Sequence, residues 1–126
     1  MPGEPKAASS KASAHTHAEA ITLEEFQRVN LRLAVVKSVE AHPKADKLYV
    51  LKLDVGELGE RQVVAGLKAH YKPEELVGKT VAFVANLQPA MLRGVESQGM
   101  VLAADDGATV AVLQPQRDLP PGSKIR

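Results

Sequence analysis

The sequence predicts an all-β domain: a small five-stranded barrel with a short helix between its third and fourth strands and an extension at each end. Three observations lead to this class. Short runs rich in β-branched residues recur along the chain. Turns containing glycine or proline separate these runs, and each helical signal is only one or two turns long. At 126 residues and 44% hydrophobic, the chain is long enough and apolar enough for one domain.

The first twenty residues contain no leucine, isoleucine, valine or aromatic residue. Such a segment cannot offset the entropy lost on ordering by burying apolar surface. We therefore expect residues 1–20 to be a disordered tail or linker and residues 21–126 to form the barrel domain. His15 and His17 lie close together in this tail, but no further metal ligand is near them, so we predict no metal site.

Order is expected to begin with a short helix over 22–28, because Thr22 and Glu25 have the spacing of a capping box. Three β-rich runs come next. The polar segment 42–47 separates the first run from the second, and a turn with two glycines separates the second run from the third. The expected strands cover 31–40, 48–55 and 61–65.

A second short helix is expected over 72–76. Pro73 suits a first helical position, the two glutamates after it suit the positive end of the helix dipole, and Gly78 would end the helix. The rest of the chain is expected to contain a strand over 80–85, a long irregular stretch over 86–98, a strand over 99–104, a hairpin turn at 105–107, a short strand over 109–113 and an extended tail over 114–126.

Three strands, a short helix and two further strands are the order of an OB-fold. Its ligand face uses the second and third strands and the loops that join strands 1–2 and strands 4–5. In this chain those loops are 42–47 and 86–98, which are also the least generic stretches of the sequence. The sequence therefore predicts a binding site at these two loops.

Several function classes are excluded by what the sequence lacks. Without cysteine there is no disulfide framework, thiolate zinc site or cysteine nucleophile. There is no phosphate-binding P-loop and no G-x-G-x-x-G motif, and the segment 94–99 has the wrong spacing for a nucleophile elbow. We expect no catalytic residue, cofactor or metal. No apolar run is long enough for a membrane helix and no secretory signal is visible, so we expect a cytoplasmic location.

The first loop carries Lys44 and Lys47 with Asp46 between them. A pair of cations on the ligand side of such a barrel could contact phosphates. The alternative is a solvated turn in which Asp46 bonds to the local backbone. Because the net charge is only +1, any basic site has to come from where the charges lie rather than from their excess.

The second loop supplies Arg93, which can grip a phosphate or stack on a base. Asn86 and Ser97 can bond to bases, sugars or backbone, although Asn86 could instead cap the fourth strand. Met100 could contact a ligand, but its residue type favours the barrel core. The chain has only four aromatic residues, and Tyr49 and Tyr71 are the only candidates for stacking on bases. This scarcity favours a folded RNA that is recognised by its shape and phosphates over a single strand.

Five motifs in fixed order resemble the tRNA-binding domain of bacterial methionyl-tRNA synthetases and of free-standing tRNA-binding proteins. They are His42–Leu48 (HPKADKL), Arg61–Gly66 (RQVVAG), Pro73–Lys79 (PEELVGK), Val84–Pro89 (VANLQP) and Leu92–Met100 (LRGVESQGM). The resemblance covers residues 21–126. It implies tRNA contacts at Lys47, Arg93, Ser97 and Met100, with weaker candidates at Asn86 and at Arg32, where Asn30 replaces the acid of the family's Asp-Leu-Arg stretch.

The resemblance also implies a non-catalytic module that binds tRNA with little sequence reading and forms a homodimer through residues near 21–31 and 108–126. The module would deliver tRNA to the catalytic body of a methionyl-tRNA synthetase, or act as a stand-alone relative. Two alternatives stay open. One is a peptide-binding chaperone of the CsaA kind, with Met91, Leu92 and Met100 as its apolar site. The other is a scaffold that only dimerises its parent enzyme.

Overall fold

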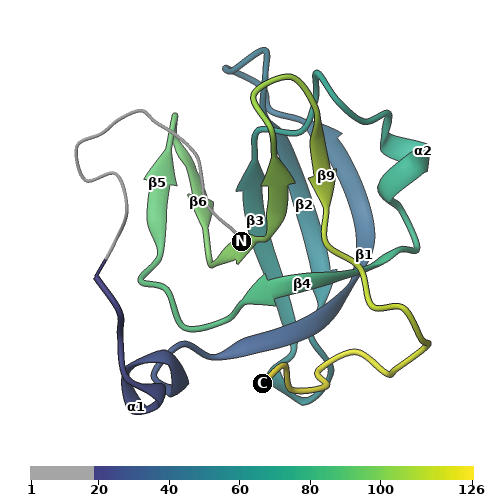
Figure 1. Cartoon of the computed structure of the whole chain (residues 1–126). Helices are drawn as coiled ribbons and strands as arrows, with labels where there is room; N and C mark the ends of the chain where they lie inside the picture. Colours follow the sequence, from purple (N-terminus) through teal and green to yellow (C-terminus); the bar gives the residue numbers. More distant parts are fainter. Residues whose placement is uncertain (1–18) are drawn as a thin grey trace.

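The computed structural model describes residues 19–126. The expected tail up to residue 18, with His15 and His17, lies outside the described residues. A five-stranded antiparallel sheet in the order β3-β2-β1-β4-β7 forms the body of the molecule (Figure 1). This confirms the predicted all-β barrel. Its strands are β1 (Leu31–Ala41), β2 (Tyr49–Asp54), β3 (Glu60–Ala65), β4 (Thr80–Val84) and β7 (Met100–Val101).

The long strand β1 lies at the centre of the sheet and serves both halves of it. Residues 35–41 pair with β2, and residues 31–35 pair with β4. The register shifts between Val36 and Ser38, so that Lys37 is an extra, exposed residue on this strand. Such a bulge bends a strand and increases its twist, which lets one strand join two neighbours that curve around the core.

The core lies inside this curved sheet. Its members are the inward-facing residues of the strands, and burying each large side chain contributes about 1.5–3 kcal/mol. The short helix α2 (Pro73–Leu76) adds Leu76 to the same cluster, and the 3-10 turn Gly56–Leu58 connects β2 to β3. The largest fully buried side chains are Phe83, Leu51, Leu53, Val36, Val55, Val63 and Val81.

Both predicted helices are present and are as short as expected. In α1 (Leu23–Gln27), the Glu25 backbone N–H donates to Thr22 Oγ1 over 3.1 Å, and the Thr22 N–H donates to Glu25 Oε1 over 2.8 Å. The predicted capping box is therefore confirmed. No residue of α1 is buried, so the apolar side chains of this helix do not join the barrel core.

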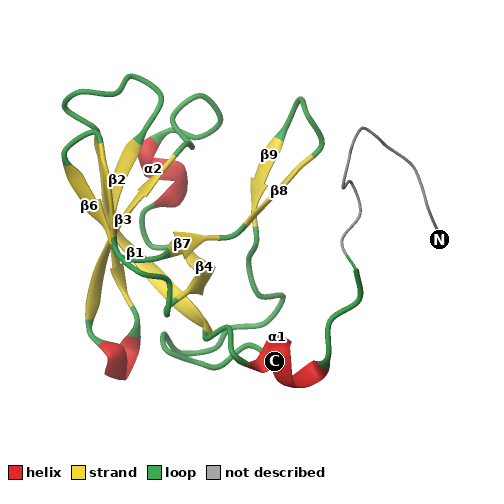
Figure 2. Ribbon diagram, turned by 90° about the vertical axis from the view of Figure 1, so that its left-hand side faces the viewer, coloured by secondary structure: helices red, strands yellow, loops and turns green. Residues whose placement is uncertain are grey.

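Two predictions about the second half of the chain were wrong in detail. The stretch 86–98 is not wholly irregular, because it contains a hairpin of β5 (Ala90–Leu92) and β6 (Val95–Ser97). The single strand expected over 99–104 is divided. Only its first part, β7, pairs with β4, whereas β8 (Ala103–Asp105) pairs with β9 (Val110–Val112) in a hairpin that projects from the barrel (Figure 2).

The C-terminal segment is extended, as predicted, and it is bonded to β1. The Leu33 N–H donates to the Ser123 carbonyl, the Gly122 N–H to the Leu33 carbonyl and the Ile125 N–H to the Leu31 carbonyl. These bonds bring the chain end beside α1 at the start of β1 (Figures 1 and 2). Among the described residues, no helix has the length and hydropathy needed to cross a membrane.

Candidate nucleic-acid interface

The two loops predicted to form the site meet in the structure. The His42 imidazole, at the start of the β1–β2 loop, lies 2.9 Å from the Leu92 carbonyl oxygen at the tip of the β5–β6 hairpin through its Nε2. An Arg93 guanidinium nitrogen donates to the Lys44 carbonyl oxygen over 3.2 Å. Segments about fifty residues apart in the sequence are thus joined into one surface.

Three cations stand on this surface. Lys44, Lys47 and Arg93 are all exposed. The described part of the chain contains a single salt bridge, which joins Arg32 to Glu57 elsewhere on the molecule. The three cations therefore have no carboxylate partner among the described residues, and an anionic ligand could approach them without breaking an ion pair.

Exposed apolar side chains lie along the segment 87–100 that contains Arg93. Met91 is 66% exposed and Met100 is 47% exposed, and Leu87 and Leu92 are also exposed. The assignment of Met100 to the core on residue type was therefore wrong. It stands near the end of β4 on the short strand β7, where its side chain is open to a ligand. Sulfur-containing and branched side chains of this kind can contact bases or an apolar partner.

Neither tyrosine is available as a base platform. Tyr49 is buried, and its hydroxyl donates to the Tyr71 carbonyl oxygen over 2.7 Å. The Tyr71 hydroxyl accepts a hydrogen bond from the Val112 N–H, and its ring packs against the core. With both rings engaged in the fold, stacking of RNA bases on tyrosine has no support in this barrel.

Ser97 lies inside the contact that closes the barrel between β3 and the β6–β7 segment. Its hydroxyl accepts from the buried Val64 N–H over 3.0 Å and is 3.2 Å from the Gly99 carbonyl oxygen, to which it can donate. Gln62 completes the closure, since its side chain donates to the Glu96 carbonyl and its backbone N–H donates to the Gln98 side chain. Sequence reasoning did not single out Gln62, whose type alone carries no signal of such a role.

Asn86 and Arg32 are also engaged within the fold. The Asn86 side-chain oxygen accepts from the Asn30 N–H, and its amide nitrogen donates to the Arg28 carbonyl, over 2.8 Å and 2.7 Å. Arg32, with its side chain 15% exposed, donates to Asn30 Oδ1 and to the Gly122 carbonyl. The two side chains fix the connection between α1 and β1.

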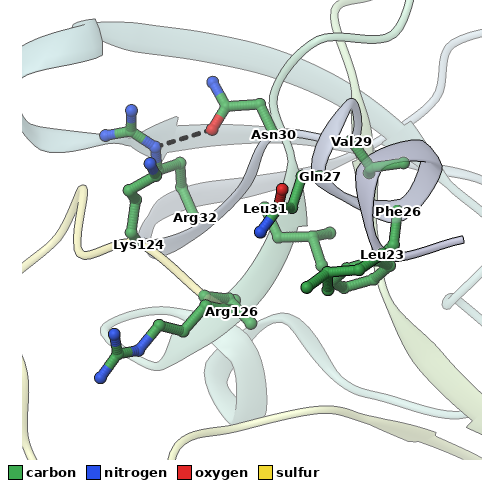
Figure 3. Close-up of a pocket in the computed structure, with 10 residues that line it drawn as sticks. Leu23, Phe26, Gln27, Val29, Asn30, Leu31, Arg32, Lys124 and Arg126 are labelled. Carbon is green, nitrogen blue, oxygen red and sulfur yellow. Dashed lines mark hydrogen bonds between the residues drawn. The ribbon is translucent and has the colours of Figure 1, made fainter.

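An apolar groove of about 820 Å³ lies at the other end of β1 from His42. Figure 3 shows the Leu23, Phe26 and Val29 side chains gathered on one wall, with Arg32, Lys124 and Arg126 along the opposite side. Leu23 is 69% exposed and Val29 is 43% exposed, so α1 presents its apolar residues to solvent in the single chain.

The strand order defines a barrel of the OB class, and its joined loops carry an exposed surface with cationic and apolar side chains. Residues 31–124 match the tRNA binding domain family (tRNA_bind), and the chain belongs to that family. The resemblance identified from the five motifs is thereby confirmed.

Curated relatives and solved structures agree with this assignment. The chain is 55% identical over 107 residues to methionine–tRNA ligase of Pyrococcus furiosus and 49% identical over 106 residues to that of Thermotoga maritima. Each alignment covers 84% of this chain but only 14% and 17% of the respective ligase. Among solved structures, the MetRS related protein from Pyrococcus horikoshii superposes with a TM-score of 0.80 and the CsaA chaperone from Bacillus anthracis with 0.78. Both are 34% identical, and each alignment covers 86% of this chain and 100% of the other.

Proposed function

We propose that this chain is a non-catalytic module that binds tRNA by its shape and backbone, with little sequence specificity. The observation that carries the proposal is the joining of the two loops, which groups Lys44, Lys47 and Arg93 without carboxylate partners in a barrel of the tRNA-binding family. Phosphate contacts from such cations fix the position of a nucleic acid but read no bases. The absence of a free tyrosine platform agrees with a folded RNA.

Within this proposal the site residues have two kinds of role. Lys47, Arg93 and Lys44 contact tRNA directly from the joined loops, where each is exposed, and Met100 contacts it from its exposed position on β7. Ser97, Asn86 and Arg32 act by holding the loops and the start of β1, because their polar atoms are already bonded within the fold. The three residues of the second group therefore support the contacts without making them.

The module serves aminoacylation in the cytoplasm in this proposal, as an appended part or a free-standing relative of a methionine–tRNA ligase. The chain aligns with only 14% of the Pyrococcus furiosus ligase, and in this proposal its residues take no part in catalysis. Binding tRNA beside a catalytic body raises the local concentration of the substrate and lowers the apparent KM for tRNA.

The proposal includes a homodimer, and the groove beside α1 supports it. Leu23, Phe26 and Val29 leave apolar surface uncovered, and Ile125 brings the C-terminal segment to the same place. A second copy of the chain would cover both. Sedimentation should give a dimer at micromolar concentration and a monomer for Phe26→Asp, whereas a monomeric parent chain at that concentration would refute the pairing.

The deciding experiment is a mobility-shift titration against unfractionated tRNA and an unstructured RNA of equal length, at two salt concentrations. We expect tighter, salt-sensitive binding to tRNA. Arg93→Ala and Lys47→Ala should each weaken it for all tRNAs and reduce the salt slope by about one. Lys79→Ala is the matched control, because Lys79 is an exposed cation far from the two loops. Its carbonyl oxygen accepts from the N–H of Val36, which lies six residues, or roughly 20 Å, along β1 from His42. Equal losses of tRNA affinity in all three variants would refute the proposed site.

The exposed apolar side chains at Met91, Leu92 and Met100 favour a second candidate, a peptide-binding chaperone of the CsaA kind. An extended apolar peptide should then compete with tRNA or bind alone, and Met91→Ser should abolish that binding. Equal affinity for both RNAs together with peptide binding would favour this candidate. A chain that dimerises but binds neither ligand would be a scaffold.

A further inference from the structure

His42 is one of two buried polar residues within the described part of the chain, and both of its ring nitrogens are bonded. Its Nδ1 lies 2.9 Å from the Lys44 backbone nitrogen. A backbone N–H can only donate, so Nδ1 carries no proton and the ring is neutral. The proton is then on Nε2, which donates to the Leu92 carbonyl oxygen. The surroundings therefore select one tautomer.

These bonds close a ring between the two loops. The Lys44 N–H donates to His42, His42 donates to the Leu92 carbonyl, and Arg93 returns to the Lys44 carbonyl. We call these contacts the His42 ring. Arg93 has a φ of 53°, a left-handed conformation that residues other than glycine rarely adopt. A turn of this kind needs its surroundings to hold it, and the ring bonds the hairpin tip at two points, the Leu92 carbonyl oxygen and the Arg93 guanidinium.

The ring adds no charge to the two loops. Lys44, Lys47 and Arg93 carry like charges on adjoining loops, and no carboxylate among the described residues pairs with them. His42 supplies a bridge that is buried and uncharged, so it adds no further positive charge to the cluster.

We propose that His42 is a positioning residue for tRNA binding, whose Nε2–H bond to the Leu92 carbonyl presets the spacing of Arg93 from Lys44 and Lys47. The inference rests on the proposed function, because it concerns the same loops. Cations held at a set spacing before the ligand arrives lose less freedom on binding, so affinity rises without any new contact. His42 itself touches no RNA in this account.

Two substitutions separate the two bonds of the imidazole. In His42→Gln, the terminal amide nitrogen takes the place of Nε2 and can still donate to Leu92. In His42→Asn, the amide oxygen takes the place of Nδ1 and can accept from the Lys44 N–H, but the side chain is too short to reach the hairpin. Each variant therefore keeps one of the two bonds, and only His42→Gln keeps the bond between the loops.

We expect His42→Asn to bind tRNA about tenfold more weakly and His42→Gln to stay within about threefold of the parent chain. The slope of log affinity against log salt should be unchanged in both, because neither variant removes a cation. A merely structural histidine would give equal losses in the two variants, and that result would overturn the proposal. So would parental affinity in His42→Asn.

The parent chain supplies a second measurement that does not depend on any variant folding. The ¹⁵N resonances of the His42 ring should report a neutral imidazole with its proton on Nε2, before and after tRNA is added. A charged ring or the other tautomer would overturn the proposal. A parent chain that does not bind tRNA would overturn the proposed function together with this role, whereas tight binding by both parent and His42→Asn would overturn the role alone.

Discussion

Replacing Ser97 with alanine tests whether this residue holds the barrel closed or touches RNA. The substitution removes the hydroxyl that accepts from the Val64 N–H over 3.0 Å. Val64 is 8% exposed and Ser97 5% exposed, so water cannot easily take over the lost acceptor. Leaving a buried donor unsatisfied costs about 1–3 kcal/mol. We expect the free energy of unfolding to fall by that amount, because β3 and β6 lose part of their connection.

Urea denaturation followed by circular dichroism measures this loss. For a domain of this size, about 2 kcal/mol should move the unfolding midpoint by about 1 M. Ser38→Ala is the control, because Ser38 is half-buried in β1 and its hydroxyl bonds to no other described residue. Under conditions where Ser97→Ala remains folded, its salt slope for tRNA should equal that of the parent chain. An unchanged midpoint together with a reduced slope would refute the structural role and favour direct contact.

Three further substitutions test the fold. Leu51→Asp should prevent folding, because it places an unpaired charge at a fully buried position of β2, and circular dichroism would detect the loss. Gly99→Ala should lower the urea midpoint by about 1 M, since a methyl group there would meet a core aromatic ring and a β4 carbonyl, whereas Gly66→Ala, with room for a methyl, is the control. The N–H groups of Thr109 and of the residue before it hold the pKa of Asp106 below its ordinary value. The Asp106 carboxylate therefore stabilises the β8–β9 turn fully at pH values above its ordinary pKa, and this stabilisation is lost as the pH falls through the lowered pKa. Asp106→Asn should make the free energy of unfolding depend less on pH in this acid range, as a stability profile against pH would show.

The strand pattern could be predicted because apolar periodicity and turn residues are local signals. The capping box of Thr22 and the helix begun by Pro73 are local in the same sense. The β5–β6 hairpin escaped notice because its strands have three residues each and the first residue of its Arg93-Gly94 turn is an arginine with a positive φ, where asparagine or aspartate is expected. The division of the strand over 99–104 depends on which neighbour each part meets, and no local pattern encodes that.

The candidate site shows the same limit. The cations of the two loops could be selected by residue type and by their place in the strand order, and the structure brings them together. The closing role of Ser97 and the bridge made by His42 depend on partners 33 and 50 residues away in the sequence. A serine or histidine carries no mark of such a partner. Burial of Tyr49 likewise depends on the completed barrel.

Because the net charge of the chain is only +1, the salt dependence of tRNA binding should come mainly from the cations of the site. The salt dependence can therefore indicate how the chain assembles on tRNA. A barrel that neutralises phosphates with Lys44, Lys47 and Arg93 should show a slope of about −2 to −3 in log affinity against log salt, since each phosphate contact contributes about −0.7 to −0.9. A dimer engaging one tRNA with both sites should give about twice that slope. Titrations between 50 and 200 mM salt, in steps on the order of 50 mM, cover the range in which such slopes are measured. Phe26→Asp should then halve the slope while leaving each site intact, because it acts at the groove beside α1. An equal slope in Phe26→Asp and the parent chain would mean that one barrel binds each tRNA, whatever its state of assembly.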